Sequence, residues 1–446
     1  MLLQLKKNPL LLGTMVLTVT GFISRFIGFF YRIFMSRLFG SEGMGIYQLI
    51  SPVLALSFSL TVAGMQTAIS KYVAGETLSK DYRSSATHLC TGFIISMVVS
   101  ILCAGGIYFY ADEIAVYFLM EKRTAPLLRI IALSVPMATI HSCINGYFYG
   151  IRKTTVPALC QLAEQLIRVG SVYFIYYYCL RRNMVPTISF AVLGLVIGES
   201  AAMLVSLIAV RAHFGHVVPK NYGPLLCLNT ARFMTSSKQL LILAVPLSLN
   251  RVVINFLQSV EAVFIPNRLL AYGYSQANAL GVYGVLTGMS LPLILFPSAI
   301  TNSICVLLLP IVSEADAADN TQQIKKAVTK SIRYGFLLGI IFTLFFLIFG
   351  KGLGNLLYKN PLSGTFIMIL SFLCPLMYIA NTLSSIMNGL GQTGLTFLYS
   401  MLSLIVRLAF VFFAIPIWGI YGYLWGLLAS QLVQTLLCMY AVRKYC

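Results

Sequence analysis

Runs of about 20 or more apolar residues recur from one end of this chain to the other, and a soluble core could not bury all of them. Such a run crosses the hydrocarbon of a bilayer as a helix, because backbone amides find no water there. Only 10% of the 446 residues are charged, whereas a soluble domain carries about 25%. The sequence therefore predicts an all-α polytopic membrane protein.

The apolar runs define about twelve transmembrane helices. The longest polar connection, residues 212–238, separates an N-terminal six-helix lobe (residues 1–211) from a C-terminal six-helix lobe (residues 239–446). An amphipathic surface helix is also expected over residues 313–334, where Ile324, Val328 and Ile332 recur every fourth residue between basic side chains. The expected spans are residues 10–35, 46–73, 88–110, 127–149, 156–180, 187–210, 239–264, 282–310, 332–350, 364–388, 395–416 and 420–442.

The two lobes resemble each other in sequence. The segment that begins at Gly150 and ends at Arg168 matches the segment from Gly389 to Arg407, and Gly45 matches Gly281 at nearly the same offset. Each lobe has an even number of spans, so both lobes insert the same way up. The sequence therefore predicts a parallel repeat with its axis along the membrane normal.

The charge pattern indicates orientation in a membrane. The chain has 31 Lys and Arg residues against 12 Asp and Glu, a formal net charge of +19. The basic residues concentrate in the connections on the side that holds both termini, as the positive-inside rule predicts for the cytoplasm. We therefore expect a multi-pass protein of the cell membrane, with cytoplasmic termini, that contacts membrane lipids and no nucleic acid.

Polar stripes that include arginine mark the leading span of each lobe. Arg25 and Arg32 share one face of the first span with small residues, and Arg251, Asn255 and Gln258 share one face of the seventh span. Placing an arginine at the bilayer centre costs about 2.5–3.5 kcal/mol on insertion scales, so a functional or structural role must offset this cost. The stripes predict a wet cavity that these five residues line as a substrate-binding site. For Arg32, snorkelling to the outer surface is the alternative.

Charged residues also lie within other spans. Glu164 and Arg168 are four residues apart in the fifth span, so they are expected to form a neutralised packing pair, with a role in coupling as the alternative. Glu199 in the sixth span and Arg407 in the eleventh have no partner in their own helix. These two residues are expected to pair elsewhere or to serve coupling.

Several kinds of catalytic and ligand-binding motif are missing from the sequence. It contains no Walker A sequence, no GxSxG or SxxK motif, no CxxC pair and no HExxH-like spacing. We therefore expect no catalytic residues, no metal and no cofactor. A membrane glycan polymerase is the alternative from another functional class, and it would need an acid in an outer loop, such as Asp112, Glu113 or Glu121.

Three stretches resemble the stage V sporulation protein B family, which belongs with the polysaccharide-precursor flippases and the lipid II flippase in the multidrug/oligosaccharidyl-lipid/polysaccharide exporter superfamily. They are Gly21-Phe-Ile-Ser-Arg25-Phe-Ile-Gly28-Phe-Phe-Tyr-Arg32, Gly40-Ser-Glu-Gly43-Met-Gly45-Ile-Tyr47 and Ala63-Gly64-Met-Gln-Thr-Ala68-Ile-Ser70-Lys71. Asn388-Gly389-Leu-Gly391-Gln-Thr393 is typical of the same group.

The resemblance implies a multidrug-exporter-like fold of two lobes around a central cavity, and alternating access. It also implies cavity arginines: Arg25 fits the first-helix pattern of the lipid II flippase, Arg32 is shifted by one residue, and Arg251 corresponds to a cationic position on the seventh helix. Many of these flippases have fourteen helices, of which the last two help to form a lipid-tail groove, whereas this chain is expected to have about twelve.

The expected function is that of a flippase, not an enzyme. It would translocate a lipid-linked (undecaprenyl-pyrophosphate) cell-wall glycan precursor across the cytoplasmic membrane, for peptidoglycan or spore cortex synthesis, and act as a monomer. The alternative within the same fold is a cation-coupled multidrug exporter. Sodium-coupled exporters usually place an acid on the first helix, whereas this first helix has arginines and no acid, which favours an anionic substrate.

Overall fold

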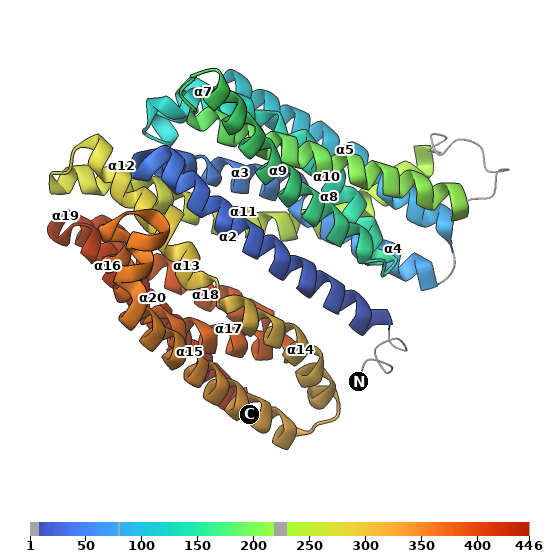
Figure 1. Ribbon diagram of the computed structural model, residues 1–446. Coiled ribbons are helices and arrows are strands. Elements are labelled where there is room, and N and C mark those ends of the chain that lie inside the picture. Colours follow the sequence, from blue (N-terminus) through green and yellow to red (C-terminus); the bar gives the residue numbers. More distant parts are fainter. Residues whose placement is uncertain (1–8, 79–80, 218–229, 446) are drawn as a thin grey trace. The chain divides into compact units, whose positions relative to one another are not determined.

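The computed structural model describes residues 9–78, 81–217 and 230–445, and every regular element within these ranges is helical (Figure 1). Of these residues, nine helices are long and apolar enough to cross a membrane, or eleven if two sharply bent pairs each count as one span. The expected all-α polytopic class is confirmed. Packing divides the chain into two compact units.

The first unit contains the described residues up to Tyr31 and residues Leu49–Ser259. Its centre is apolar, and Ile69, Cys143 and Leu240 are among its fully buried side chains. Helices α5, α8, α9 and α10 pack beside one another (Figure 1). The helices of this unit are the first part of α2 (Pro9–Leu49), α3 (Ser51–Phe58), α4 (Gly64–Leu78), α5 (Tyr82–Phe109), α6 (Ala111–Glu113), α7 (Ala125–Ala132), α8 (Ser134–Gly150), α9 (Thr155–Arg181), α10 (Ile188–Val217) and the first part of α11 (Thr230–Tyr272).

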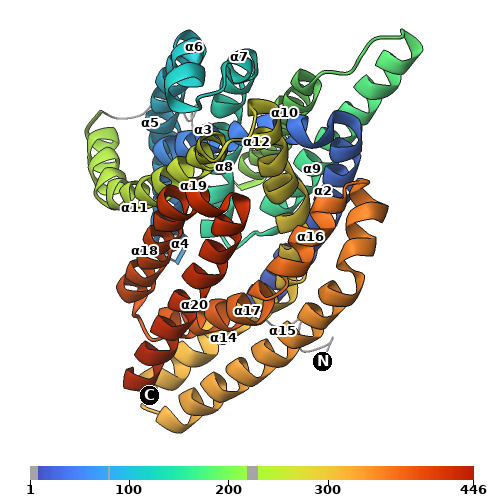
Figure 2. The same ribbon diagram turned by 90° about the vertical axis from the view of Figure 1, so that its left-hand side faces the viewer.

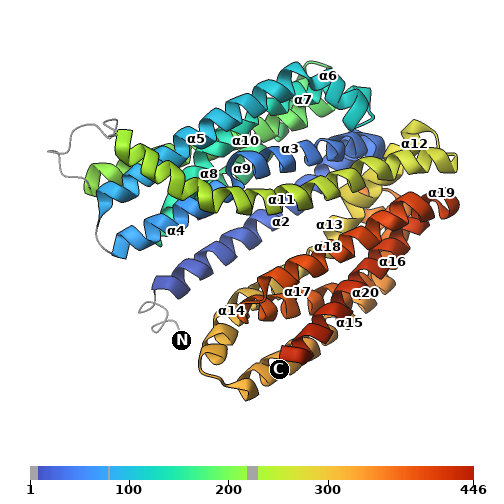
Figure 3. The ribbon, with the colours of Figure 1, turned by 180° about the vertical axis from the view of Figure 1, so that it is seen from behind.

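The second unit contains residues Arg32–Gln48 and Val260–Cys446. Helix α17 packs against α14, α15 and α20, and α20 also packs against α18 (Figures 2 and 3). The helices of this unit are the remaining parts of α2 and α11, together with α12 (Gln276–Gly284), α13 (Leu291–Leu295), α14 (Ser298–Ala317), α15 (Thr321–Tyr358), α16 (Pro361–Leu370), α17 (Leu373–Gly389), α18 (Thr393–Ala409), α19 (Ile415–Trp418) and α20 (Ile420–Tyr445).

The two units exchange short segments relative to the lobes expected from the sequence. Residues 32–48 pack with the second unit, and residues 239–259 pack with the first. The boundaries between the units thus fall inside α2, which is kinked at Gly40, and inside α11. The expected lobe boundaries, with their linker at residues 212–238, stay a prediction about the inserted protein.

The helices differ from the expected spans in three places. The first two spans form one apolar stretch, Met15–Thr77, and the eighth is replaced by two stretches, Gln276–Leu295 and Ser298–Ala317. The expected span 156–180 is helix α9, which is helical as predicted but is not among the candidate spans of the described chain. Its polar side chains, which include Glu164 and Arg168, account for that.

The surface helix expected over residues 313–334 is not a separate element. Helix α14 ends at Ala317, and α15 begins at Thr321 and continues to Tyr358. Ile324 is buried, and Val328 and Ile332 pack against a buried cluster of α17 and α20 side chains. The apolar side chains do share one side of the helix, as expected, but that side packs against protein instead of lipid.

The repeat between the halves is visible in helix contacts inside each unit. A Cβ added at Gly150, the end of α8, would lie 2.9 Å from the Ser70 carbonyl oxygen of α4. A Cβ added at Gly389, the end of α17, would lie 3.0 Å from the Leu309 carbonyl oxygen of α14. Ser70 and Leu309 are separated by the same number of residues as the two glycines. Equivalent residues therefore make equivalent close contacts in the two units.

Candidate functional site

A cluster of ionisable side chains lies inside the first unit, where α8, α9 and α10 meet. The Arg168 guanidinium of α9 forms an ion pair with Glu164 one turn earlier. Its Nη2 atom also lies 3.5 Å from Oε1 of Glu199 on α10. The other carboxylate oxygen of Glu199, Oε2, lies 2.8 Å from Nε2 of His141 on α8. Four charged or titratable groups from three helices thus form one network.

A glycine brings these helices close enough for the network to form. A Cβ added at Gly198 of α10 would lie 2.9 Å from the Glu164 carbonyl oxygen and 3.0 Å from Cβ of Arg168. Helix α10 therefore passes directly over the turn of α9 that carries the ion pair. Glu199, the next residue, reaches Arg168 for this reason. Any larger residue at position 198 would separate the two helices.

The network holds two carboxylates and one guanidinium. Its formal charge is −1 when His141 is neutral and zero when His141 is protonated. One ligand atom each from His141, Glu164 and Glu199 lies within 4.8 Å of the others, a spacing that a cation could bridge. The arrangement can therefore take up a positive charge, either as a proton on His141 or as a small cation.

The second unit contains a simpler ion pair. Nε of Arg407 on α18 lies 2.5 Å from Oε1 of Glu261 on α11, and the Tyr423 hydroxyl of α20 donates a hydrogen bond of 2.7 Å to the same oxygen. Glu261 is only 5% exposed. Arg407 is the repeat equivalent of Arg168, so the equivalent arginine is ion-paired in both units. The acids differ, because they come from different helices.

Arg25 and Arg251 contrast with these paired arginines. Both belong to the first unit, on α2 and α11, and both are exposed in the absence of a membrane. Among the described residues, neither guanidinium has an acidic partner or a hydrogen-bond acceptor. Arg25 lies one turn before Gly28, whose added Cβ would be 3.2 Å from the Gln165 side chain of α9. The two cations are therefore available to a ligand.

The expected stripe on the seventh span is divided by packing. Nδ2 of Asn255 donates hydrogen bonds to the Ala55 carbonyl oxygen, at 3.3 Å, and to the Ser59 hydroxyl. Arg251 and Gln258, seven residues apart on one edge of α11, are both exposed. Asn255 thus joins α11 to the segment around α3, while Arg251 and Gln258 remain accessible.

Arg32 lies in the other unit. It is half-buried on the second part of α2, within electrostatic reach of Tyr47 and Tyr358. Farther along the same helix, Arg37 donates hydrogen bonds of 2.8 and 2.6 Å to the carbonyl oxygens of Leu357 and Leu356. This end of α2 is therefore anchored to the end of α15.

Sequence reasoning missed His141 and Tyr423. Neither has a local spacing signal, because each meets its acid from a distant helix; only the polarity of His141 within an apolar helix could have drawn attention to it. Of the loop acids that a polymerase would need, Asp112 pairs with Arg129 at 2.6 Å, and Glu121 pairs with Arg123 at 2.8 Å. These two acids are occupied by structural partners.

Comparison with known proteins identifies the family of the chain. The sequence matches the family described as "Polysaccharide biosynthesis protein" over residues 10–315 and 308–446. Stage V sporulation protein B of Bacillus subtilis (strain 168) is 27% identical over 440 residues, which are 98% of this chain and 84% of that protein. Lipid II flippase MurJ of the same organism is 22% identical over 367 residues, which are 79% of this chain and 65% of that protein.

Solved structures share the fold. An inward-facing multidrug resistance MATE family transporter of the MOP superfamily superposes with a TM-score of 0.73 at 15% identity, covering 95% of this chain and 94% of that one. A MOP superfamily transporter from Pyrococcus furiosus gives a TM-score of 0.66 at 15% identity, covering 98% and 96%. The expected exporter fold is confirmed. The activities named among these proteins are those of a flippase and of transporters.

Proposed function

Because the chain belongs to the polysaccharide biosynthesis protein family, we propose that it is a flippase for an undecaprenyl-pyrophosphate-linked glycan precursor of peptidoglycan or spore cortex. It carries this lipid outward across the cell membrane by alternating access, with both termini in the cytoplasm. Stage V sporulation protein B and the lipid II flippase, both similar over most of the chain, support a cell-wall precursor as the substrate.

The observation that carries the proposal is the division of the membrane arginines into two kinds. Arg168 and Arg407 are neutralised by glutamates within their own units. Arg25 and Arg251 are exposed and, in the described part of the chain, have no such partner. An uncompensated arginine within a membrane span is costly, so it is retained for a ligand that supplies the missing negative charge.

A pyrophosphate fits this requirement. The guanidinium is planar and donates two parallel hydrogen bonds to phosphate oxygens, and it stays charged at every physiological pH. Arg25 and Arg251 bind the pyrophosphate, Gln258 hydrogen-bonds to the glycan, and Asn255 positions α11. Arg32 contributes a further positive charge on the second part of α2.

A cation-coupled multidrug exporter of the same fold is the second candidate. The network of His141, Glu164 and Glu199 favours it, because these residues can take up a proton or a small cation. In the flippase, the same network serves as a buried pair that fixes α8, α9 and α10, or couples transport to an ion.

The decisive experiment combines depletion with complementation. Cells depleted of the protein are expected to accumulate a lipid-linked glycan that mass spectrometry identifies. Arg25→Ala and Arg251→Ala should each fail to clear this intermediate, because each removes half of the charge that binds the pyrophosphate.

Arg83→Ala is the matched control, since Arg83 is an exposed arginine near the start of α5 that has no place in the proposed site. The control should clear the intermediate like the unaltered protein, at equal membrane abundance. Full activity of both Arg25→Ala and Arg251→Ala would refute the site. Accumulation of no lipid-linked glycan, together with loss of drug resistance, would favour the exporter.

A further inference from the structure

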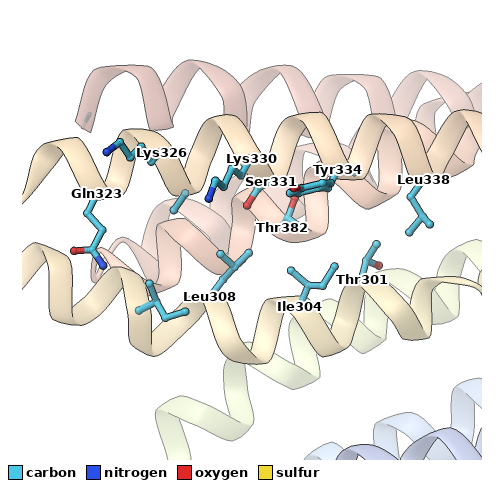
Figure 4. A pocket seen from close by; sticks show the side chains of 13 residues that line it. Thr301, Ile304, Leu308, Gln323, Lys326, Lys330, Ser331, Tyr334, Leu338 and Thr382 are labelled. Carbon is cyan, nitrogen blue, oxygen red and sulfur yellow. The ribbon is translucent and has the colours of Figure 1, made fainter. Parts of the chain in front are cut away.

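A groove in the second unit lies apart from every residue discussed so far as a substrate ligand. It has a volume of about 410 Å³ and runs between α14 and α15, with α17 behind it. Ile304 and Leu308 of α14 face Lys330, Ser331 and Tyr334 of α15 across the groove (Figure 4). From Gln323 to Leu338, the lining residues of α15 extend about 22 Å at a rise of 1.5 Å per residue.

The shape of the groove follows from small side chains on α15. Ala327, Ser331 and Gly335 follow one another at intervals of four residues on the side of α15 that lines the groove, and they leave space. One turn farther, a Cβ added at Gly339 would lie 2.3 Å from Cα of Pro375, so α15 and α17 are in direct contact there. Helices α15 and α17 are therefore in contact just beyond the residues that line the groove.

The charges of the groove lie toward the turn between α14 and α15. Lys326 and Lys330 lie one turn apart on α15 and line the groove, whereas the lining of α14 is Thr301 and three aliphatic residues. In the described part of the chain neither lysine forms an ion pair. The acids Glu314, Asp316 and Asp319 lie near the turn but do not line the groove. The lining thus carries two positive charges beside an apolar channel.

We propose that this groove binds one anionic glycerophospholipid, with its phosphate at Lys326 and Lys330 and one acyl chain along Ile304 and Leu308. The turn of residues 318–320 is polar and exposed, so it marks the membrane–water interface. Lys326 and Lys330 lie about two and three helical turns beyond it along α15, and their long side chains extend back toward the phosphates of the headgroups. The apolar remainder then lies at the depth of the acyl chains.

The site is independent of the proposed transport substrate. A phospholipid held here would lie against α14, α15 and α17, all within one unit, and would fix the first part of α15 relative to α14. If the pyrophosphate of the transport substrate is bound at Arg25 and Arg251, its polyprenyl tail has no phosphate left for Lys326 and Lys330. Charge complementarity at the two lysines therefore favours a membrane phospholipid as the occupant.

Photo-cross-linking of the full-length protein in nanodiscs tests this assignment. Phosphatidylglycerol and phosphatidylcholine carry the same diazirine-labelled acyl chain, at equal abundance in an otherwise identical bilayer. Phosphatidylglycerol should label peptides of α14 and α15 that line the groove at least several-fold more than phosphatidylcholine does. Lys326→Gln/Lys330→Gln should remove most of this selectivity, since each lysine near a membrane surface contributes about fivefold to the binding of an anionic lipid.

Lys325→Gln/Arg333→Gln is the matched control, because it removes the same charge from the same helix outside the groove lining. It should leave the labelling intact. Ile304→Trp, which narrows the channel without changing its charge, should reduce labelling at unchanged thermal stability. Equal labelling by the two lipids, or equal losses in the two double variants, would overturn the proposal. Displacement of the label by undecaprenyl phosphate but not by phosphatidylglycerol would also overturn it.

Discussion

At the scale of single residues, the arginines inside the helices divide by whether an acid meets them. Arg407 is the clearer example of a paired arginine. Its partner Glu261 is almost fully buried, pairs with the guanidinium and accepts a hydrogen bond from the Tyr423 hydroxyl. Removing one member of a buried ion pair leaves the other charge uncompensated, which is worse than removing both. The pair is therefore expected to behave as a unit.

Arg407→Gln should destabilise the protein strongly, by about 3–5 kcal/mol, because it leaves the Glu261 carboxylate without a counter-charge. Glu261→Gln/Arg407→Gln should recover most of that loss of stability. Tyr423→Phe should lower stability by only about 1 kcal/mol, because it removes one hydrogen bond from an uncharged donor. Thermal unfolding in one detergent compares the three variants. A double variant no more stable than Arg407→Gln would show that the two residues do not form a coupled pair.

How much of the site the sequence could predict depends on the distance between partners along the chain. Glu164 and Arg168 are four residues apart, so helical geometry alone predicts their meeting, and the structure has that ion pair. Glu261 and Arg407 lie on different helices, and only the fold brings them together. The same holds for His141 and Glu199. The polar stripes of single helices marked Arg25 and Arg251 as candidate ligands. They did not predict that Asn255 would donate hydrogen bonds to Ala55 and Ser59.

At the scale of helices, glycine determines how closely α2 approaches α12. A Cβ added at Gly45 would lie 2.1 Å from the Leu280 carbonyl oxygen, and one added at Gly284 would lie 2.1 Å from the Ser41 carbonyl oxygen. Real Cβ atoms do not approach an oxygen so closely. Both partners of each contact lie in the second unit, so this backbone-to-backbone contact is part of its interior.

Gly45→Ala should therefore lower stability by about 1–3 kcal/mol, because the two backbones must separate to admit a methyl group. Gly21→Ala, in the same helix, is the control: nothing lies within 4 Å of its added Cβ, and alanine favours the helix by about 1 kcal/mol. Fluorescence-detected melting of the purified variants gives the comparison. Equal melting temperatures for Gly45→Ala and Gly21→Ala would contradict the close contact.

The elements themselves were largely predictable from apolar runs, and the exceptions have physical causes. No proline or polar break separates the amphipathic stretch from the ninth span, so α15 continues through both. Helix α2 continues past the expected end of the first span but is kinked at Gly40, whose φ of 68° is not helical, and a second helical segment follows as far as Leu49. Hydropathy marks where a chain can enter a membrane, but backbone continuity is decided by local geometry that hydropathy does not report.

At the scale of the whole molecule, the proposed transport needs a source of direction. We propose that the membrane potential supplies it, with an ion gradient as the alternative. One elementary charge that crosses 100 mV gains about 2.3 kcal/mol, so a dianion that leaves a negative interior gains about 4–5 kcal/mol. That is a bias of more than a thousandfold. The potential alone is therefore sufficient.

Flipping by the protein reconstituted in vesicles should fall when the membrane potential is collapsed at constant proton and sodium gradients. Glu199→Gln should leave this dependence intact, because the carboxylate network does not carry the driving charge. The measurement sets the potential and the ion gradients independently. Transport that survives collapse of the potential, but stops when an ion gradient is removed or when Glu199 is replaced, would establish antiport instead.

The two arginine networks differ in where the compensating acid lies along the chain. Arg168 and Arg407 occupy equivalent places in the two halves, whereas the place equivalent to Glu164 is Ser403, whose hydroxyl donates a hydrogen bond to the Ser430 carbonyl oxygen. The basic residue is shared by both copies, and the acid beside it is not. Glu164, on the fifth helix of the first half, compensates Arg168, whereas Glu261, on the first helix of the second half, compensates Arg407. Because Glu261 precedes Arg407 by far more residues than Glu164 precedes Arg168, the second pair forms only when distant helices have packed.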